Sequence, residues 1–307
     1  MNALVYSGPG AGNRSTQSAL HALRSTLHPS IVHHVSTIDA RTLIEEHREW
    51  QKTCCVLVMP GGADVPYCRD LGETGTRIIR EWVEEKGGFY LGLCAGAYFG
   101  SARVEFEKGT ELEVVGERRL RFYKGTARGS VYPGFCYQTE SGALAAPVRF
   151  IDPKTGIDDV GNIGGHLSWR MCCDYVNGGP YWMCHHDTSQ VLRIHSIKTD
   201  VDVLATYPEK NHAVSAMRVK VGNGNAVLCS SHPELDSETW LHGPMNAISD
   251  HVQRRVEESH PDVEHDWKYL QHVREMVRVL DAHADRRRDL WRLLLAAGGL
   301  KSSIIWD

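Results

Sequence analysis

Short apolar runs alternate with stretches of helical periodicity through the first hundred residues of the chain. Runs such as Ala3–Tyr6 and Val56–Met59 have the length of buried strands, and each is followed by a cluster of glycine and proline. Two groups of apolar residues at helical spacing lie after these runs: Ala19, Leu20, Leu23 and Leu27, and then Ile78, Ile79, Trp82 and Val83. The alternation predicts an α/β fold, a mainly parallel sheet flanked by helices, with its ligand site at the carboxyl ends of the strands.

The pattern changes between residues 104 and 208, where short alternating runs are separated by frequent glycines. We expect this middle insertion to be β-rich, largely antiparallel strand and loop, and to determine specificity. Residues 213–228 predict a hairpin around Gly222-Asn223-Gly224, which returns the chain to the main sheet. Between residues 260 and 300 the apolar positions again have helical spacing, which predicts a helical C-terminus. We interpret residues 1–307 as a single domain.

The composition narrows the classes of function. The chain has 34 Lys and Arg against 38 Asp and Glu, a formal net charge of −4, which gives no general attraction to nucleic acid or to an acidic membrane. We see no signal peptide and no apolar run long enough to span a bilayer, so we expect a cytoplasmic protein. The nine cysteines are an odd number, and Cys54-Cys55 and Cys172-Cys173 are adjacent pairs, which favours reduced thiols.

Two polar clusters have plain interpretations. Cys184-His185-His186-Asp187 combines metal-ligating residue types, but neighbouring residues seldom chelate one ion, and no second pair follows at the spacing of a zinc site. We therefore predict no metal and no cofactor. Arg286-Arg287-Arg288 lies beside Asp285 and Asp289, and we interpret this charge pattern as a solvated helix face rather than a nucleic-acid patch.

The segment GLCAGAYFG, from Gly92 to Gly100, is the most informative for chemistry because it directly follows the apolar run Phe89–Leu91. A reactive residue between small residues, where a strand turns sharply into a helix, is typical of a nucleophile elbow. Small neighbours are needed there because the strained backbone passes close to the following helix. The pattern predicts Cys94 as a nucleophile, with the helix favouring its thiolate form. The alternative is a buried structural cysteine behind a glycine-rich turn.

A later segment, AVLCSSHPELD, supplies a base and a carboxylate just after another apolar strand. We predict that His232 acts as the general base for Cys94 and that Glu234 fixes the tautomer of the imidazole. The loop Pro60–Asp64 ends its strand at the same edge of the sheet. The backbone N–H groups of Gly62 and Ala95 are therefore the predicted oxyanion donors. Asp64 and Tyr67 are expected to line the pocket.

Taken together, these motifs resemble known families. The Gly-Gly loop, the elbow and the HPE segment resemble the class I glutamine amidotransferase fold, which is flavodoxin-like. LVYSGPGAG, PGGADVPY, CAGAYFGSARVEF, RFYKGTARG and YVNGG are together similar to the amino-terminal domain of fungal biotin–protein ligases. The resemblance runs from Met1 to near Leu300, which implies a free-standing homologue of that domain. The family's amidotransferase-like catalytic residues map onto Cys94, His232 and Glu234.

One position departs from the pattern of the glutaminases of that class. They place a glutamine four residues after the nucleophile to help hold the substrate, whereas this chain has Tyr98 there. We expect negligible glutaminase activity and an acyl group more apolar than glutamine, unless the ring simply packs under the loop. In the middle segment the residues expected to approach the site, on resemblance and on glycine-rich loop chemistry, are Tyr175, Asn177, Gly178 and Gly179.

Three hypotheses for the function remain open at this point. The first is an enzyme that uses Cys94 to hydrolyse an amide, ester or thioester of a small molecule, or to transfer its acyl group to an amine; by analogy it serves fungal secondary metabolism, with a carrier protein or synthetase as partner. The second is a non-catalytic module that senses a metabolite or redox state through Cys94 and has no need of Glu234. The third is a glutaminase subunit that feeds ammonia to a separate synthetase. The sequence does not indicate the oligomeric state.

Overall fold

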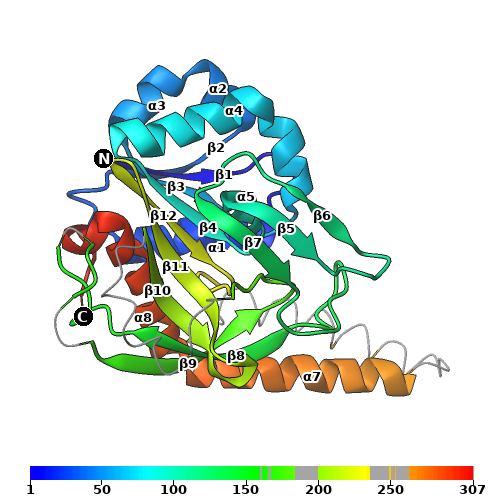
Figure 1. Cartoon of the computed structure of the whole chain (residues 1–307). Helices are drawn as coiled ribbons and strands as arrows, with labels where there is room; N and C mark the ends of the chain where they lie inside the picture. The colour runs from blue at the N-terminus through cyan, green and yellow to red at the C-terminus, as the bar shows by residue number, and fades with distance from the viewer. Residues whose placement is uncertain are drawn as a thin grey trace.

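A nine-stranded sheet runs through the molecule in the order β2-β1-β3-β4-β12-β11-β10-β8-β9 (Figure 1). The computed structural model describes residues 1–159, 161–164, 167–183, 200–235, 249, 253 and 263–306. The first five strands in the order are parallel to their neighbours: β2 (His34–Ile38), β1 (Asn2–Tyr6), β3 (Cys54–Met59), β4 (Phe89–Leu93) and β12 (Gly224–Cys229). The remaining four are antiparallel: β11 (Ala213–Val221), β10 (Val201–Tyr207), β8 (Leu144–Ile151) and β9 (Trp169–Val176). The parallel sheet and the predicted hairpin are confirmed.

Helices cover both faces of the sheet, so the strands of the parallel half are apolar on both sides. In β1, Ala3 and Val5 face one core and Leu4 and Tyr6 the other. The first core is covered by α1 (Asn13–Thr26) and α8 (Ala284–Leu295). The second is covered by α2 (Ala40–Glu45), α3 (His47–Thr53), α4 (Asp64–Lys86) and the short α5 (Ala95–Gly100). Figure 1 shows α2, α3 and α4 together above the sheet.

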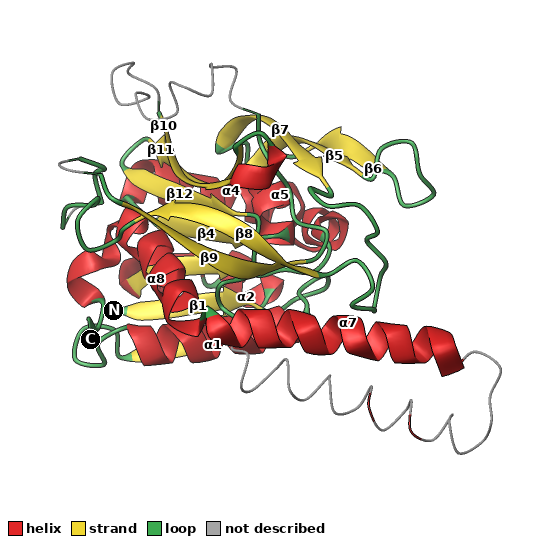
Figure 2. Cartoon of the chain, turned by 90° about the horizontal axis from the view of Figure 1, so that it is seen from below, coloured by secondary structure: helices red, strands yellow, loops and turns green. Residues whose placement is uncertain are grey.

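The C-terminal helices are confirmed. The long helix α7 (Val263–Ala282) lies along β8 and β9, as Figure 2 shows from below, and α8 then returns to the sheet. The described residues also include three short helical turns: η3 (Pro208–Lys210), η5 (Ala296–Leu300) and η6 (Lys301–Ser303). No helix in the described part of the chain is long and apolar enough to cross a membrane.

The middle segment is β-rich as predicted, but it does not form one separate insertion. Its first strands make a small sheet in the order β6 (Val114–Glu117), β5 (Ser101–Phe106) and β7 (Tyr123–Gly129), in which β5 and β7 are parallel. Its later strands β8, β9 and β10 extend the main sheet instead. The reason is that the inward side chains of these strands, such as Val148 and Phe150, join the same core as β1. The segment therefore approaches the site from two sides.

Candidate active site

Cys94 occupies a sharp strand-to-helix turn, as predicted. It directly follows β4 and caps α5. Its backbone has φ +46° and ψ −99°, a conformation that residues other than glycine rarely adopt. Its backbone N–H donates to the carbonyl of Cys229 at the end of β12, at 2.8 Å. The turn also depends on Gly96, because a Cβ there would lie 2.1 Å from the carbonyl oxygen of Met59. The close approach of α5 to β3 thus fixes the thiol at the carboxyl edge of the sheet.

His232 and Glu234 lie at the same edge because β12 runs parallel to β4, so both strands end there. The Nδ1 atom of His232 is 2.7 Å from Oε1 of Glu234, and the imidazole is only 7% exposed. On its other side the ring touches the backbone of Gly61, where a Cβ would lie 2.3 Å from Cε1. The imidazole therefore has one orientation, with its remaining nitrogen directed away from Glu234.

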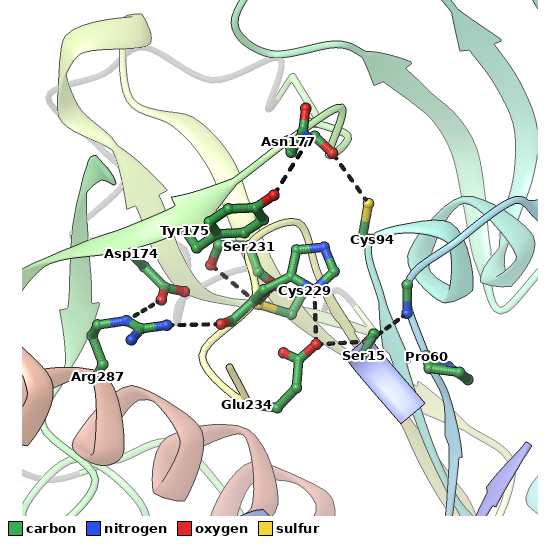
Figure 3. A network of polar contacts seen from close by, with 12 residues as sticks. Ser15, Pro60, Cys94, Asp174, Tyr175, Asn177, Cys229, Ser231, Glu234 and Arg287 are labelled. Atoms are coloured by element: carbon green, nitrogen blue, oxygen red, sulfur yellow. Dashed lines mark hydrogen bonds and ion pairs between the residues drawn. The ribbon is translucent and has the colours of Figure 1, made fainter. Parts of the chain in front are cut away.

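The electrostatics of His232 follow from this arrangement. Burial disfavours the charged ring, but the carboxylate of Glu234 and the hydrogen bond and charge of Cys94 outweigh it, so the pKa of His232 is raised well above its ordinary value. The thiol of Cys94 also lies 3.9 Å from the backbone carbonyl of Asn177, to which it donates (Figure 3). The site thus favours a state in which the imidazole holds the proton.

Ser15 supports this pair and was missed by sequence reasoning. Its hydroxyl, near the start of α1, donates to Oε1 of Glu234 at 2.7 Å and accepts the N–H of Gly61 at 2.8 Å. Figure 3 shows Ser15 directly beside Glu234. The only signal in the sequence was a serine a few residues after the first glycine-rich turn, which does not by itself indicate a partner 219 residues away.

Arg287 is buried, which corrects the prediction that the arginine cluster on α8 is a solvated face. Its side chain is 3% exposed, whereas Arg286 and Arg288 are exposed as predicted. It pairs with the fully buried carboxylate of Asp174 at 2.7 Å and donates to the backbone carbonyl of His232 at 3.0 Å (Figure 3). Asp289 is also buried and pairs with Arg170. One turn of the helix therefore presents two charged groups inward, of which Arg287 reaches the back of the site.

The predicted oxyanion donors have free N–H groups. Gly62 lies opposite Ala11 in an antiparallel bridge. The hydrogen bonds of this bridge join Gly12 to Gly61 and Ala63 to Gly10, so the N–H of Gly62 points away from residues 10–12. Ala95 is the first residue of α5 and has no partner within the helix. Neither N–H finds an acceptor among the described residues. Both residues line the recess in front of Cys94.

Two recesses meet at Cys94, and three residues, Gly62, Cys94 and Asn177, line both of them. One recess, of about 320 Å³, is mostly apolar and is lined by Ala63, Asp64, Val65, Pro66, Ala95, Tyr98, Phe106, Val114, Phe135, Tyr137 and Gly178. The other, called the polar recess because it holds more polar and charged side chains, includes His232 and is lined by Gly12, Arg14, Ser15, Gly61, Gln138, Thr139, Glu140, Tyr175 and Leu235. Of the residues predicted to bind substrate, Asp64, Tyr98, Asn177, Gly178 and Tyr175 thus line a recess beside Cys94.

Two predicted pocket residues do not line either recess. Tyr67 is 0% exposed, and its hydroxyl donates to the carbonyl of Pro60 at 3.0 Å, so it supports the loop from below. Gly179 packs against the residue that follows β12, since a Cβ there would lie 2.2 Å from the carbonyl oxygen of Ser230. These positions fix the site's framework rather than its surface.

Tyr98 takes both roles that its position suggested. Its ring lines the apolar recess and packs edge to face on Phe106, with centroids 5.7 Å apart. Its hydroxyl donates to the carbonyl of Gly178 at 3.0 Å, so the phenol also holds the middle loop over the site. Asp64, at the start of α4, is neutralised by Arg118, whose Nε lies 2.5 Å away.

The polar recess contains an ion pair that sequence reasoning did not identify. Arg14 Nη1 lies 2.5 Å from Oε1 of Glu140, and the hydroxyl of Tyr175 donates to the other oxygen of Glu140. The ring of Tyr175 packs edge to face on His232 at 5.6 Å. No group of three potential metal ligands occurs among the described residues, and the Cys184–Asp187 cluster lies outside them.

Comparison with known proteins gives a family and two curated relatives. The family model described as the N-terminal part of biotin–protein ligase matches residues 1–303. The biotin–protein ligase of Schizosaccharomyces pombe is 37% identical over 241 residues, which are 78% of this chain and 34% of the ligase. An uncharacterized protein of Chlamydia muridarum is 41% identical over 150 residues, which are 48% of this chain and 57% of that protein. The matched regions are thus only part of each relative's length.

Among solved structures, a glutamine amidotransferase is 18% identical, with 76% of this chain and 90% of that chain covered and a TM-score of 0.42. At this score the likeness adds nothing to the topology described above. The arrangement of strands and helices therefore rests on the chain's own sheet order and core.

Proposed function

The chain belongs to the family of biotin–protein ligase N-terminal domains, and from this premise we propose that it is a cysteine-dependent acyl-transfer enzyme. Cys94 is the nucleophile, His232 carries the proton and Glu234 orients the imidazole. The observation that carries the proposal is that the strained Cys94 and His232 line one recess, with His232 Nδ1 2.7 Å from Oε1 of Glu234. A cysteine that only sensed redox state would need neither the oriented imidazole nor the buried carboxylate.

The chemistry proceeds in two halves. The sulfur of Cys94 attacks the carbonyl carbon of an amide, ester or thioester, and the N–H groups of Gly62 and Ala95 stabilise the resulting oxyanion. The imidazolium of His232 gives its proton to the departing nitrogen, oxygen or sulfur, and a thioester remains on Cys94. In the second half His232 takes a proton from water or from an amine, which attacks the thioester and releases the acyl group.

Intact-mass analysis after exposure to an activated ester tests the proposal. We expect p-nitrophenyl acetate to acetylate Cys94 rapidly. Cys94→Ala should remove the adduct, and His232→Ala should slow it strongly because the proton carrier is lost. Cys136→Ala is the matched control, since Cys136 is an exposed thiol whose side chain lines neither recess. Burial raises the pKa of Cys55 to about 11 and raises those of Cys172 and Cys229 as well, so these thiols should contribute little background.

Peptide mapping distinguishes the alternatives. Acylation of Cys136 alone would refute the role of Cys94. A Cys94 that is alkylated by iodoacetamide but never acylated would favour the sensing module, and ammonia release from glutamine would restore the glutaminase. We expect acylation of Cys94. We expect no ammonia release, because the recess beside Cys94 is apolar and Tyr98 occupies the position of the glutamine found in glutaminases.

A further inference from the structure

We propose that the substrate joins an uncharged, apolar acyl group to a polar leaving group, with the acyl group in the recess of Phe106, Val114 and Phe135. The leaving group, and later the acyl acceptor, occupies the recess beside Arg14 and Glu140. This inference rests on the proposed acyl-transfer function of Cys94. It assigns the two recesses to the two halves of the substrate.

The assignment follows from the position of the proton carrier. A leaving nitrogen or oxygen must receive a proton from His232, so the leaving group has to lie on the imidazole side of the thiol. His232 lines the polar recess and not the apolar one. The acyl group, which stays on Cys94 when the leaving group departs, must therefore extend into the other recess. The same geometry places an incoming acceptor on the His232 side, because His232 must take its proton.

The apolar recess is already formed. Phe135 packs edge to face on Phe106 at 5.2 Å and on Tyr137 at 4.8 Å, so three aromatic rings make a continuous wall. Its volume of about 320 Å³ is at the lower end of the range of roughly 300–1,000 Å³ for small-molecule pockets. A short or medium-length apolar chain or a single ring fits this size.

Charge on the acyl group is disfavoured by the lining. Among the described residues that line the apolar recess, Asp64 alone is charged, and its carboxylate is already paired with Arg118. A charged acyl group would lose its hydration in this recess, and no described lining side chain offers it an unpaired opposite charge. The polar recess differs, because Arg14 and Glu140 present a cation and an anion side by side. Its lining suits a leaving group that forms hydrogen bonds.

A panel of p-nitrophenyl esters tests the acyl side, because the leaving group stays constant while the acyl group changes. We expect the rate of Cys94 acylation, corrected with the Cys94→Ala protein, to be about tenfold or more higher for the hexanoate than for the acetate. The hemisuccinate, which has a carboxylate at the end of a short chain, should react more slowly than the acetate. Equal rates for all three esters would overturn the assignment while leaving the role of Cys94 intact. Failure of every ester to acylate Cys94 would instead overturn the proposed function.

Val114→Asp places a charge in the recess, and Val115→Asp on the same strand is its matched control because Val115 is 38% exposed and does not line the recess. We expect Val114→Asp to lower the hexanoate rate about tenfold more than the acetate rate, since a short acyl group does not reach the new charge. Val115→Asp should change neither. An equal loss for both esters would contradict the inference.

The opposite orientation has its own signature. Hexanoate esters of p-nitrophenol and of the smaller trifluoroethanol differ only in the leaving group. If the effect of Val114→Asp followed the leaving group rather than the acyl chain, the two recesses would have exchanged roles, and the assignment would be wrong. We expect the same fold-reduction for both alcohols.

Discussion

The two sides of the candidate site are held in place by different means. Cys94 is fixed by its own backbone: a positive φ, a ladder bond to β12 and the close packing of Gly96 on β3. The His232–Glu234 segment is fixed by distant side chains, Ser15 from α1 and Arg287 from α8. The comparison shows that a nucleophile can be encoded locally while its proton carrier depends on residues from opposite ends of the chain.

The largest expected effect is on the side-chain support of His232. Arg287→Leu leaves the carboxylate of Asp174 buried without its cation, which should lower the free energy of unfolding by about 3–5 kcal/mol. Urea denaturation measures the loss, and Arg286→Leu is the control because Arg286 is exposed on the same helix. The double variant with Asp174→Leu should recover part of the loss. If Arg287→Leu costs no more than Arg286→Leu, the His232 side does not depend on this ion pair.

A single added methyl group at Gly96 should disturb the turn that holds Cys94. Gly96→Ala places a Cβ against the carbonyl of Met59, and a backbone atom cannot move aside as a flexible side chain does. We expect a loss of about 1–3 kcal/mol in the free energy of unfolding and a loss of Cys94 reactivity with iodoacetamide. Gly164→Ala is the control, because no described atom beyond its chain neighbours lies within 4 Å of a Cβ there. Equal stability of the two variants would show that the elbow tolerates displacement of α5.

Removal of the Ser15 hydroxyl, which joins Glu234 to the Gly61 loop, should have a smaller effect on the free energy of unfolding. Ser15→Ala deprives Glu234 of a donor and the Gly61 N–H of an acceptor, which should lower the free energy of unfolding by about 1–2 kcal/mol. The acylation rate should fall while iodoacetamide alkylation of Cys94 changes less, because no hydrogen bond among the described residues joins Ser15 to Cys94. Ser25→Ala, on an exposed position of the same helix, is the control. A fall in alkylation as large as the fall in acylation would argue against separate supports.

The smallest and most gradual expected effect is the change of the free energy of unfolding with pH. Because the pKa of His232 is raised in the folded protein, the folded state binds a proton that the unfolded chain releases near pH ~6.5. The resulting stabilisation is complete below that pH and is lost as the pH rises through the folded pKa. Glu234→Gln should flatten this decline, since the carboxylate is the main cause that raises the pKa. Urea midpoints measured at several pH values for both proteins test this, and identical slopes would contradict it.

The sequence predicted the turn that holds Cys94 far better than the side chains that support the His232–Glu234 segment. The elbow and the β11–β12 hairpin are local patterns, in which the small residues and apolar runs that make the structure are neighbours. Arg287 has the same flanking charges as a solvated face, and only the position of Asp174, 113 residues earlier, makes it buried. Tyr67 was predicted to line the pocket, but it lies in the core. Since α4 begins at Asp64, Tyr67 is one helical turn further along the helix, where its ring is fully buried.

β12 lies where the parallel half of the sheet meets the antiparallel half, and its pairing has a consequence for tolerance to insertion. Leu228 and Cys229 pair with Gly92 and Leu93, so the separation of thiol and imidazole is set by strand register rather than by loop length. A one-residue insertion within β12 would shift the following segment by about 3.3 Å and reverse its faces. Extra residues in the exposed turn at 107–111, between β5 and β6, would leave that register unchanged. Length variation in this chain should therefore collect in such turns and be absent from the paired central strands.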